Sequence, residues 1–204
     1  MASIERLFAT KIYRAALTGA PARRLNKDLA DACKLIARED HAGRAWSRQH
    51  GYRGYTSYAS LADLPERAPA FADLVHHLDA HVAKFAHAVD FDLGKRRLEL
   101  DSLWLNVMQA GAVHTAHIHP KSVISGTYYV AVPPAAGALK LEDPRLGLMM
   151  AAPPRKLRAA RDNQTFVYLE PKAGTLLLWE SWLRHEVPVN RARGDRISIS
   201  FNYA

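Results

Sequence analysis

The feature that most constrains the fold of this chain is a change in the spacing of its apolar residues near position 95. Before it, helical spacing predicts helices over about 26–40, with Asn26 as the N-cap, and over about 68–89. After it, short apolar runs separated by turn residues give eight candidate strands: 101–109, 112–119, 123–132, 137–142, 165–169, 174–180, 185–189 and 195–203. Two supporting helices followed by eight strands indicate a mainly β protein built on a double-stranded β-helix, the jelly-roll or cupin-like architecture.

The length of 204 residues suits one domain. We expect residues 1–97 to supply an extended segment and the supporting helices, and residues 98–204 to form the jelly-roll core. The glycine- and aromatic-rich stretch 46–58 is expected to be a loop or an irregular strand. The connection 143–164 carries four basic residues after Gly147, and connections this long are usually lids or disordered segments. As a lid it would favour an acidic substrate.

Composition narrows the class of protein and its location. The 28 Lys and Arg residues exceed the 20 Asp and Glu residues and give a net charge of +8, but no recognition motif accompanies the charge, so nucleic acid is not an expected partner. No apolar run approaches the ~18–20 residues of a membrane span. With Cys33 as the only cysteine and no signal-peptide pattern at the N-terminus, the expected location is the cytoplasm.

Four histidines in two separated segments indicate a metal site. Side chains alternate faces along a strand, so an unbroken strand over 112–119 places His117 and His119 on one face and His114 on the other. A distant third imidazole, from His185, would complete one side of a coordination sphere and leave the other side open for a substrate. This pattern favours a mononuclear metal enzyme, an iron oxygenase in particular.

Other readings of the polar residues stay open at this point. The histidines could be satisfied or exposed without any metal, and Asp73, His77 and His81 have the spacing of a zinc clip, although they lie on the solvated face of their helix. Glu142 or Asp143 could add a carboxylate to the metal. In the last strand, Arg196, Ser198, Ser200 and Asn202 share one face, which is either a solvated outer face or an inward face able to bind a carboxylate.

Several motifs resemble a bacterial and phage-borne family of 2-oxoglutarate–Fe(II) oxygenases whose substrates are largely unassigned. They follow one another in the family's order over most of the chain, and they are Trp104–Met108, His117–Ser122, Ser125–Val130, Glu142–Arg145, Pro171 with Gly174–Leu176, Ser181–Pro188 and Arg196–Asn202. By this resemblance His117, His119 and His185 are the metal-binding and catalytic residues. Arg196 and Ser198 would hold the distal carboxylate of 2-oxoglutarate, with Asn106 and either Tyr128 or Tyr129, of which we favour Tyr128, as further cosubstrate residues.

The resemblance implies a dioxygenase that uses Fe(II), O₂ and 2-oxoglutarate, releases succinate and CO₂, and oxidises, most simply by hydroxylation, a small-molecule or peptide substrate. Only the basic 143–164 connection suggests that this substrate is acidic. A homodimer is compatible with the expected edge strands. His119 departs from the family's wider pattern, which has a carboxylate there. That departure leaves open a three-histidine, cupin-type dioxygenase that chelates its substrate directly without 2-oxoglutarate. A jelly-roll module without enzymatic activity is the third alternative.

Overall fold

Two antiparallel sheets face each other in the computed structural model, which describes residues 1–204. The larger sheet has the strand order β1-β8-β5-β10-β3-β2 and the smaller sheet the order β4-β9-β6-β7. The strands of the larger sheet are β1 (Tyr13–Ala16), β2 (Gly54–Thr56), β3 (Leu100–Met108), β5 (Ile124–Ala131), β8 (Thr175–Glu180) and β10 (Arg196–Tyr203). Those of the smaller sheet are β4 (His114–His117), β6 (Leu139–Glu142), β7 (Phe166–Leu169) and β9 (His185–Val187). All eight strands expected after residue 95 are present, and the jelly roll is confirmed.

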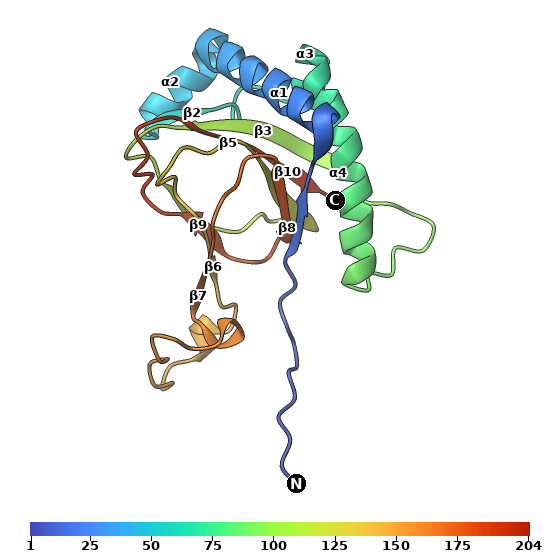
Figure 1. Cartoon of the computed structure of the whole chain (residues 1–204), viewed down its shortest axis with the longest axis vertical. Coiled ribbons are helices and arrows are strands. Elements are labelled where there is room, and N and C mark those ends of the chain that lie inside the picture. The colour runs from blue at the N-terminus through green and yellow to red at the C-terminus, as the bar shows by residue number, and fades with distance from the viewer.

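The helices cover one face of the larger sheet (Figure 1). They are α1 (Gly19–Glu39), α2 (His41–Gln49), α3 (Leu64–Arg67) and α4 (Pro69–Ala88), and two short 3-10 turns, η1 (Leu146–Leu148) and η2 (Arg161–Asn163), lie in the projecting 143–164 connection. Side chains of the strands that point toward α1 and α4 are apolar and form one continuous core with them, with Ile197, Ile199 and Phe201 of β10 as examples. The other face of β10 looks into the space between the sheets and is largely polar. The alternation seen in the sequence of β10 therefore separates a structural face from a functional face.

The N-terminal half differs from the sequence-based expectation in two places. Helix α1 begins at Gly19, so Asn26 lies inside it and is not the N-cap, which is Thr18. Asn26 instead donates a hydrogen bond to the carbonyl of Val130, 2.9 Å away, and accepts one from the hydroxyl of Tyr128 at 3.0 Å. The side-chain amide of Asn26 thus connects α1 to β5. A polar residue at this point of the sequence is typical of an N-cap, but here its polar group serves this tertiary contact.

Helix α2 was not expected from the sequence. Asp40 caps its N-terminus by accepting a hydrogen bond from the backbone N–H of Gly43 at 3.0 Å. The expected irregular segment 46–58 therefore starts inside a helix, and only its later part, which contains β2, has the predicted form. None of the helices is both long enough and apolar enough to cross a membrane.

Candidate metal centre

Three imidazoles meet between the two sheets. His117 ends β4, His119 follows two residues later and His185 begins β9, where it is paired directly with His117. One ring nitrogen from each residue lies within 4.8 Å of those of the other two, and the Nε2 atoms of His119 and His185 are 3.3 Å apart. The sequence predicted this trio, and the fold brings it together.

The second nitrogen of every ring is bound to an oxygen that can only accept a hydrogen bond. Nδ1 lies 2.6 Å from the carbonyl of Thr115 in His117, 2.7 Å from Oδ1 of Asn202 in His119 and 2.8 Å from the carbonyl of Leu183 in His185. Because these oxygens are acceptors, Nδ1 carries the proton in each ring and Nε2 keeps its lone pair. Three converging Nε2 lone pairs form a donor set suited to a transition metal, and partners of this kind fix the orientation of metal-binding histidines.

Burial keeps the imidazoles of His119 and His185 neutral. It lowers the pKa of His185 to about 3 and that of His119 to about 4, with a smaller contribution from the neighbouring His117 in both cases. His117 is the least buried of the three. Neutral rings bind a cation without competition from protons at neutral pH.

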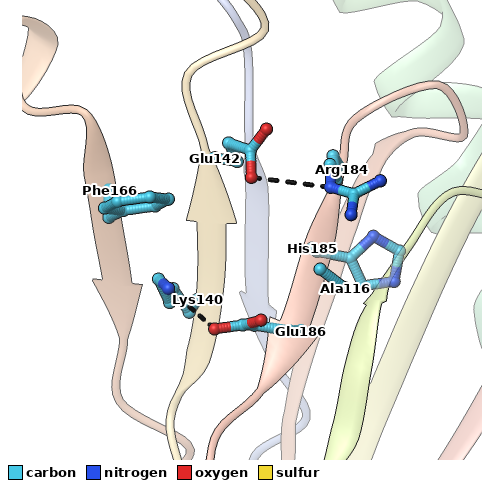
Figure 2. A pocket seen from close by; sticks show the side chains of 7 residues that line it. All are labelled: Ala116, Lys140, Glu142, Phe166, Arg184, His185 and Glu186. Atoms are coloured by element: carbon cyan, nitrogen blue, oxygen red, sulfur yellow. Dashed lines mark hydrogen bonds and ion pairs between the residues drawn. The ribbon is translucent and has the colours of Figure 1, made fainter. Parts of the chain in front are cut away.

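No carboxylate joins the three histidines. The side chain of Glu142 lies on the outer face of the smaller sheet, where it pairs with Arg184 at 3.5 Å, as Figure 2 shows. Asp143 accepts two hydrogen bonds from the guanidinium of Arg145, at 3.0 and 2.8 Å. Both acids are occupied elsewhere, so the donor set remains neutral and a bound divalent ion would keep its full charge.

The second histidine cluster does not form a metal site. Nδ1 of His81 lies 2.8 Å from the hydroxyl of Tyr13, so this ring joins α4 to β1. His77 is exposed on α4, and the ligand atoms of Asp73, His77 and His81 do not come together as those of the first cluster do. The zinc clip suggested by the spacing is absent.

A β-bulge in β4 changes the face on which His114 was predicted to lie. His117 pairs with His185 but His114 pairs with Val187, so four residues of β4 lie opposite three residues of β9. Directly opposed residues share a face, and His114 therefore lies on the same inner face as His117. It is still outside the metal cluster, as expected, but the reason is its distance along the strand and not an outward direction.

Arg196 lies on the inner face of the larger sheet and is only 2% exposed. One guanidinium nitrogen, Nη1, donates to the hydroxyl of Ser198 at 3.1 Å and contacts Sδ of Met108 at 3.4 Å. The guanidinium carbon is 5.1 Å from the centre of the Tyr129 ring. The alternative of a solvated outer face for this half of β10 is therefore wrong.

Two polar atoms, one in Arg196 and one beside it, have no hydrogen-bond partner within the chain. They are Nε of Arg196 and the hydroxyl of Tyr129, and both are fully buried. A buried charge without a carboxylate partner is costly, and an anion with several acceptor atoms would satisfy both groups. The distal carboxylate of 2-oxoglutarate has the charge and the acceptors that these residues lack, so the residues present fit the cosubstrate.

Neighbouring tyrosines of β5 point to opposite faces, and Tyr129, not Tyr128, lies beside Arg196. Tyr128 belongs to the helix-covered core and donates its hydroxyl to Asn26. The preference for Tyr128 is contradicted by this placement. Asn106 of β3 is buried and lies directly opposite Ser198, the residue that accepts a hydrogen bond from Arg196. Its side-chain amide donates to the hydroxyl of Ser200 at 3.3 Å.

Sequence reasoning did not single out Asn202, which orients His119. Its amide oxygen also accepts a hydrogen bond from Ser125 at 2.8 Å, and its amide nitrogen donates to Ser102 at 3.0 Å. The alternation of β10 placed Asn202 on the face of Arg196, so a signal was present. The stacking of Trp104 on His119, with ring centres 5.7 Å apart, had no such signal.

Comparison with known proteins agrees with this arrangement. The family model described as "Putative 2OG-Fe(II) oxygenase" matches residues 102–202, a stretch that contains the three histidines, Arg196 and Ser198. Over these residues the chain belongs to that family. It is an oxygenase that depends on Fe(II) and 2-oxoglutarate, and the three-histidine cluster could hold the metal ion. No curated protein matches it in sequence.

Solved structures of three other enzymes share the fold. A prolyl-4-hydroxylase from Pseudomonas putida is 17% identical, with a TM-score of 0.62 over 97% of this chain and 94% of that one. The alpha-ketoglutarate-dependent epimerase SnoN of nogalamycin biosynthesis is 16% identical, with a TM-score of 0.66 over 96% and 78%. A Trichoplax adhaerens prolyl hydroxylase, solved with a hypoxia inducible factor peptide fragment, is 16% identical, with a TM-score of 0.59 over 94% and 82%. These likenesses show the jelly-roll fold.

Proposed function

We propose that this oxygenase hydroxylates its substrate with His117, His119 and His185 as the Fe(II) ligands and Arg196 as the anchor of 2-oxoglutarate. Fe(II) with O₂ and 2-oxoglutarate supplies the oxidising chemistry, while the oxo acid is converted to succinate and CO₂. The chain supplies the binding geometry: Asn202 and two backbone carbonyls hold the ligand rings, and Arg196 with Ser198 and Tyr129 holds the distal carboxylate. Asn106 is proposed to line the same site.

The observation that carries this proposal is the buried and incompletely satisfied guanidinium of Arg196. The distal carboxylate of a bound 2-oxoglutarate would give this cation the anionic partner that the chain itself does not supply. The neutral metal ligands also favour an anionic bidentate chelate, because they leave the charge of the ion uncompensated. Both features support a cosubstrate with two carboxylates.

Replacement of Arg196 tests the assignment. We expect the Arg196→Gln variant to bind Mn(II), used in place of iron, as the wild type does but to bind 2-oxoglutarate about 100-fold more weakly, since a charge-assisted bidentate contact is lost. Calorimetric titration of the Mn(II)-loaded proteins measures both affinities. Equal affinity of the two proteins for 2-oxoglutarate would support the direct-chelation alternative.

For the substrate we propose an acidic peptide or an acidic small molecule. The 143–164 connection leaves the smaller sheet directly after Glu142, the residue that pairs with Arg184 next to His185. Its exposed Arg155, Lys156 and Arg158 put positive charge on a projection at this edge. Some of the similar structures are prolyl hydroxylases, one of them solved with a peptide, which makes proline-containing peptides a reasonable first panel.

A peptide panel distinguishes this substrate class. Succinate release above the substrate-free rate is expected with acidic proline-containing peptides and not with basic peptides of the same length. Simultaneous replacement of Arg155, Lys156 and Arg158 by Gln should raise KM for the acidic peptides and leave 2-oxoglutarate binding unchanged. Preference for basic peptides would contradict the proposed role of this connection.

We also propose that residues 1–204 act as one cytoplasmic unit and that two copies associate. One core cluster joins α1 and α4 to the larger sheet, which supports a single unit. Cys33 is a buried free thiol, which suits a reducing compartment. Large apolar side chains on the two projecting segments are exposed, among them Phe8, Met150 and Leu157. Light scattering after size-exclusion chromatography tests the association: a mass of 22.7 kDa would contradict it.

A further inference from the structure

The β4 bulge places a fourth histidine inside the barrel. His114 shares the inner face with His117 but pairs with Val187, two residues further along β9 than His185. Two residues of a strand span about 6.6 Å. His114 therefore lies one step away from the metal ligands along the inner face, at a separation comparable to the length of a five-carbon oxo acid.

His114 and Arg196 lie at the same end of the barrel. Arg196 pairs with Met108, the last residue of β3, and the chain turns from there directly into β4, which begins with His114. Tyr52 arrives at the same end, because Gly54 of β2 also pairs with Met108. The metal ligand His119 lies toward the opposite end, where it is bound to Asn202. One sheet thus supplies Arg196 and the other supplies His114 to the same region.

His114 and Tyr52 form a fixed pair. Nε2 of His114 lies 2.8 Å from the hydroxyl of Tyr52, and the two rings stack with centres 5.0 Å apart and planes 26° from parallel. Tyr52 also packs against the inner core cluster that contains Met108 and Tyr129. Burial, helped by the positive charge of Arg196, keeps the pKa of His114 low, at about 3, so its ring is neutral. Its Nδ1 has no hydrogen-bond partner within the chain.

We propose that Tyr52 and His114 form the wall opposite Arg196 and set the chain length of the 2-oxo acid that the enzyme accepts. The inference rests on the proposed function, since it assumes that Arg196 binds the distal carboxylate. After their mutual hydrogen bond, a neutral imidazole and a phenol have one proton left between them, which the pair can donate to that carboxylate without adding a second buried charge. Because the stacked rings are held by their mutual hydrogen bond, they would resist displacement by a longer acid.

The test compares two oxo acids that differ by one methylene group. Wild-type protein loaded with Mn(II) is titrated calorimetrically with 2-oxoglutarate and with 2-oxoadipate, and we expect it to prefer the former. In Tyr52→Ala and His114→Ala the ratio of the two affinities should shift toward 2-oxoadipate by about tenfold or more. Tyr52→Phe keeps the ring and loses the hydroxyl, so 2-oxoglutarate should bind several-fold more weakly while 2-oxoadipate stays excluded.

Controls separate this role from a structural one. Tyr168→Ala removes an exposed tyrosine from the outer face of the smaller sheet and should change neither affinity. Tyr52→Leu and His114→Gln, which retain more volume, replace either alanine variant that fails to fold. An unchanged ratio in variants that still bind Mn(II) would overturn the inference, as would loss of Mn(II) binding in the His114 variants. Wild-type protein that binds neither acid would overturn the proposed function itself, and this inference with it.

Discussion

In each of the three proposed ligand imidazoles, Nδ1 is hydrogen-bonded to an oxygen of the chain and Nε2 is left available to a metal ion. His114 differs from these three rings, because its Nε2 is already hydrogen-bonded to the hydroxyl of Tyr52. We therefore expect His119→Ala to lower Mn(II) or Fe(II) affinity by about 100-fold or more, and His114→Ala to leave metal affinity nearly unchanged. Competition titration with a chelating indicator measures both. Equal losses in the two variants would place His114 among the ligands.

Asn202 gives a second prediction at this scale. Its side-chain oxygen accepts from Nδ1 of His119 and so selects the tautomer that leaves Nε2 free. Replacement by Leu removes the acceptor at similar volume, and metal affinity should fall about 10- to 100-fold. The same titration applies, with Ser200→Ala as the control on the same strand. Metal affinity in Asn202→Leu within a factor of two of the wild type would show that the ring needs no such support.

At the scale of elements, the contact between α4 and the larger sheet stabilises the fold without touching the site. Leu74 of α4 is fully buried in the helix-side core. Leu74→Ala should lower the free energy of unfolding by about 2–5 kcal/mol and leave metal affinity intact. Urea denaturation measures the loss, and the exposed Leu35→Ala in α1, expected to cost less than about 0.5 kcal/mol, is the matched control. A parallel loss of metal binding would contradict the separation of the two faces.

The elements also show how far the sequence alone reaches. Strict alternation in β10 predicts both its strand and its two faces, and the repeated apolar runs predict the other strands of the jelly roll. The bulge in β4 could not be predicted, because two residues facing one is a property of the pairing with β9 and not of either segment by itself. Helix α2 was missed for a related reason: its nine residues carry few apolar side chains, and its start depends on the Asp40 cap. Tyr129 could be told from Tyr128 only once the pairing of β5 with β10, which sets Tyr129 opposite Ser198, was known.

For the whole molecule, the buried neutral histidines make the metal-free protein sensitive to acid. The pKa of His114 and of His185 falls from 6.5 to about 3 on folding, so between these values the unfolded chain binds more protons than the folded one. Stability is therefore highest above pH 6.5 and is lost as the pH falls, by about 1.4 kcal/mol per pH unit for each group. Urea midpoints at pH 7 and pH 5 measure the effect, and His114→Gln should reduce it. A midpoint independent of pH in this range would contradict the buried, neutral state of these rings.

The polar inward side chains of β10 have a consequence for how such an enzyme can change. The helix-side core of 24 buried residues meets no reactant, and the smaller inner cluster of 10 buried residues is built mainly from other strands. Libraries that randomise only Ser198 and Ser200 of β10 should therefore yield many soluble members, and new reactivity could be selected without first repairing a damaged scaffold.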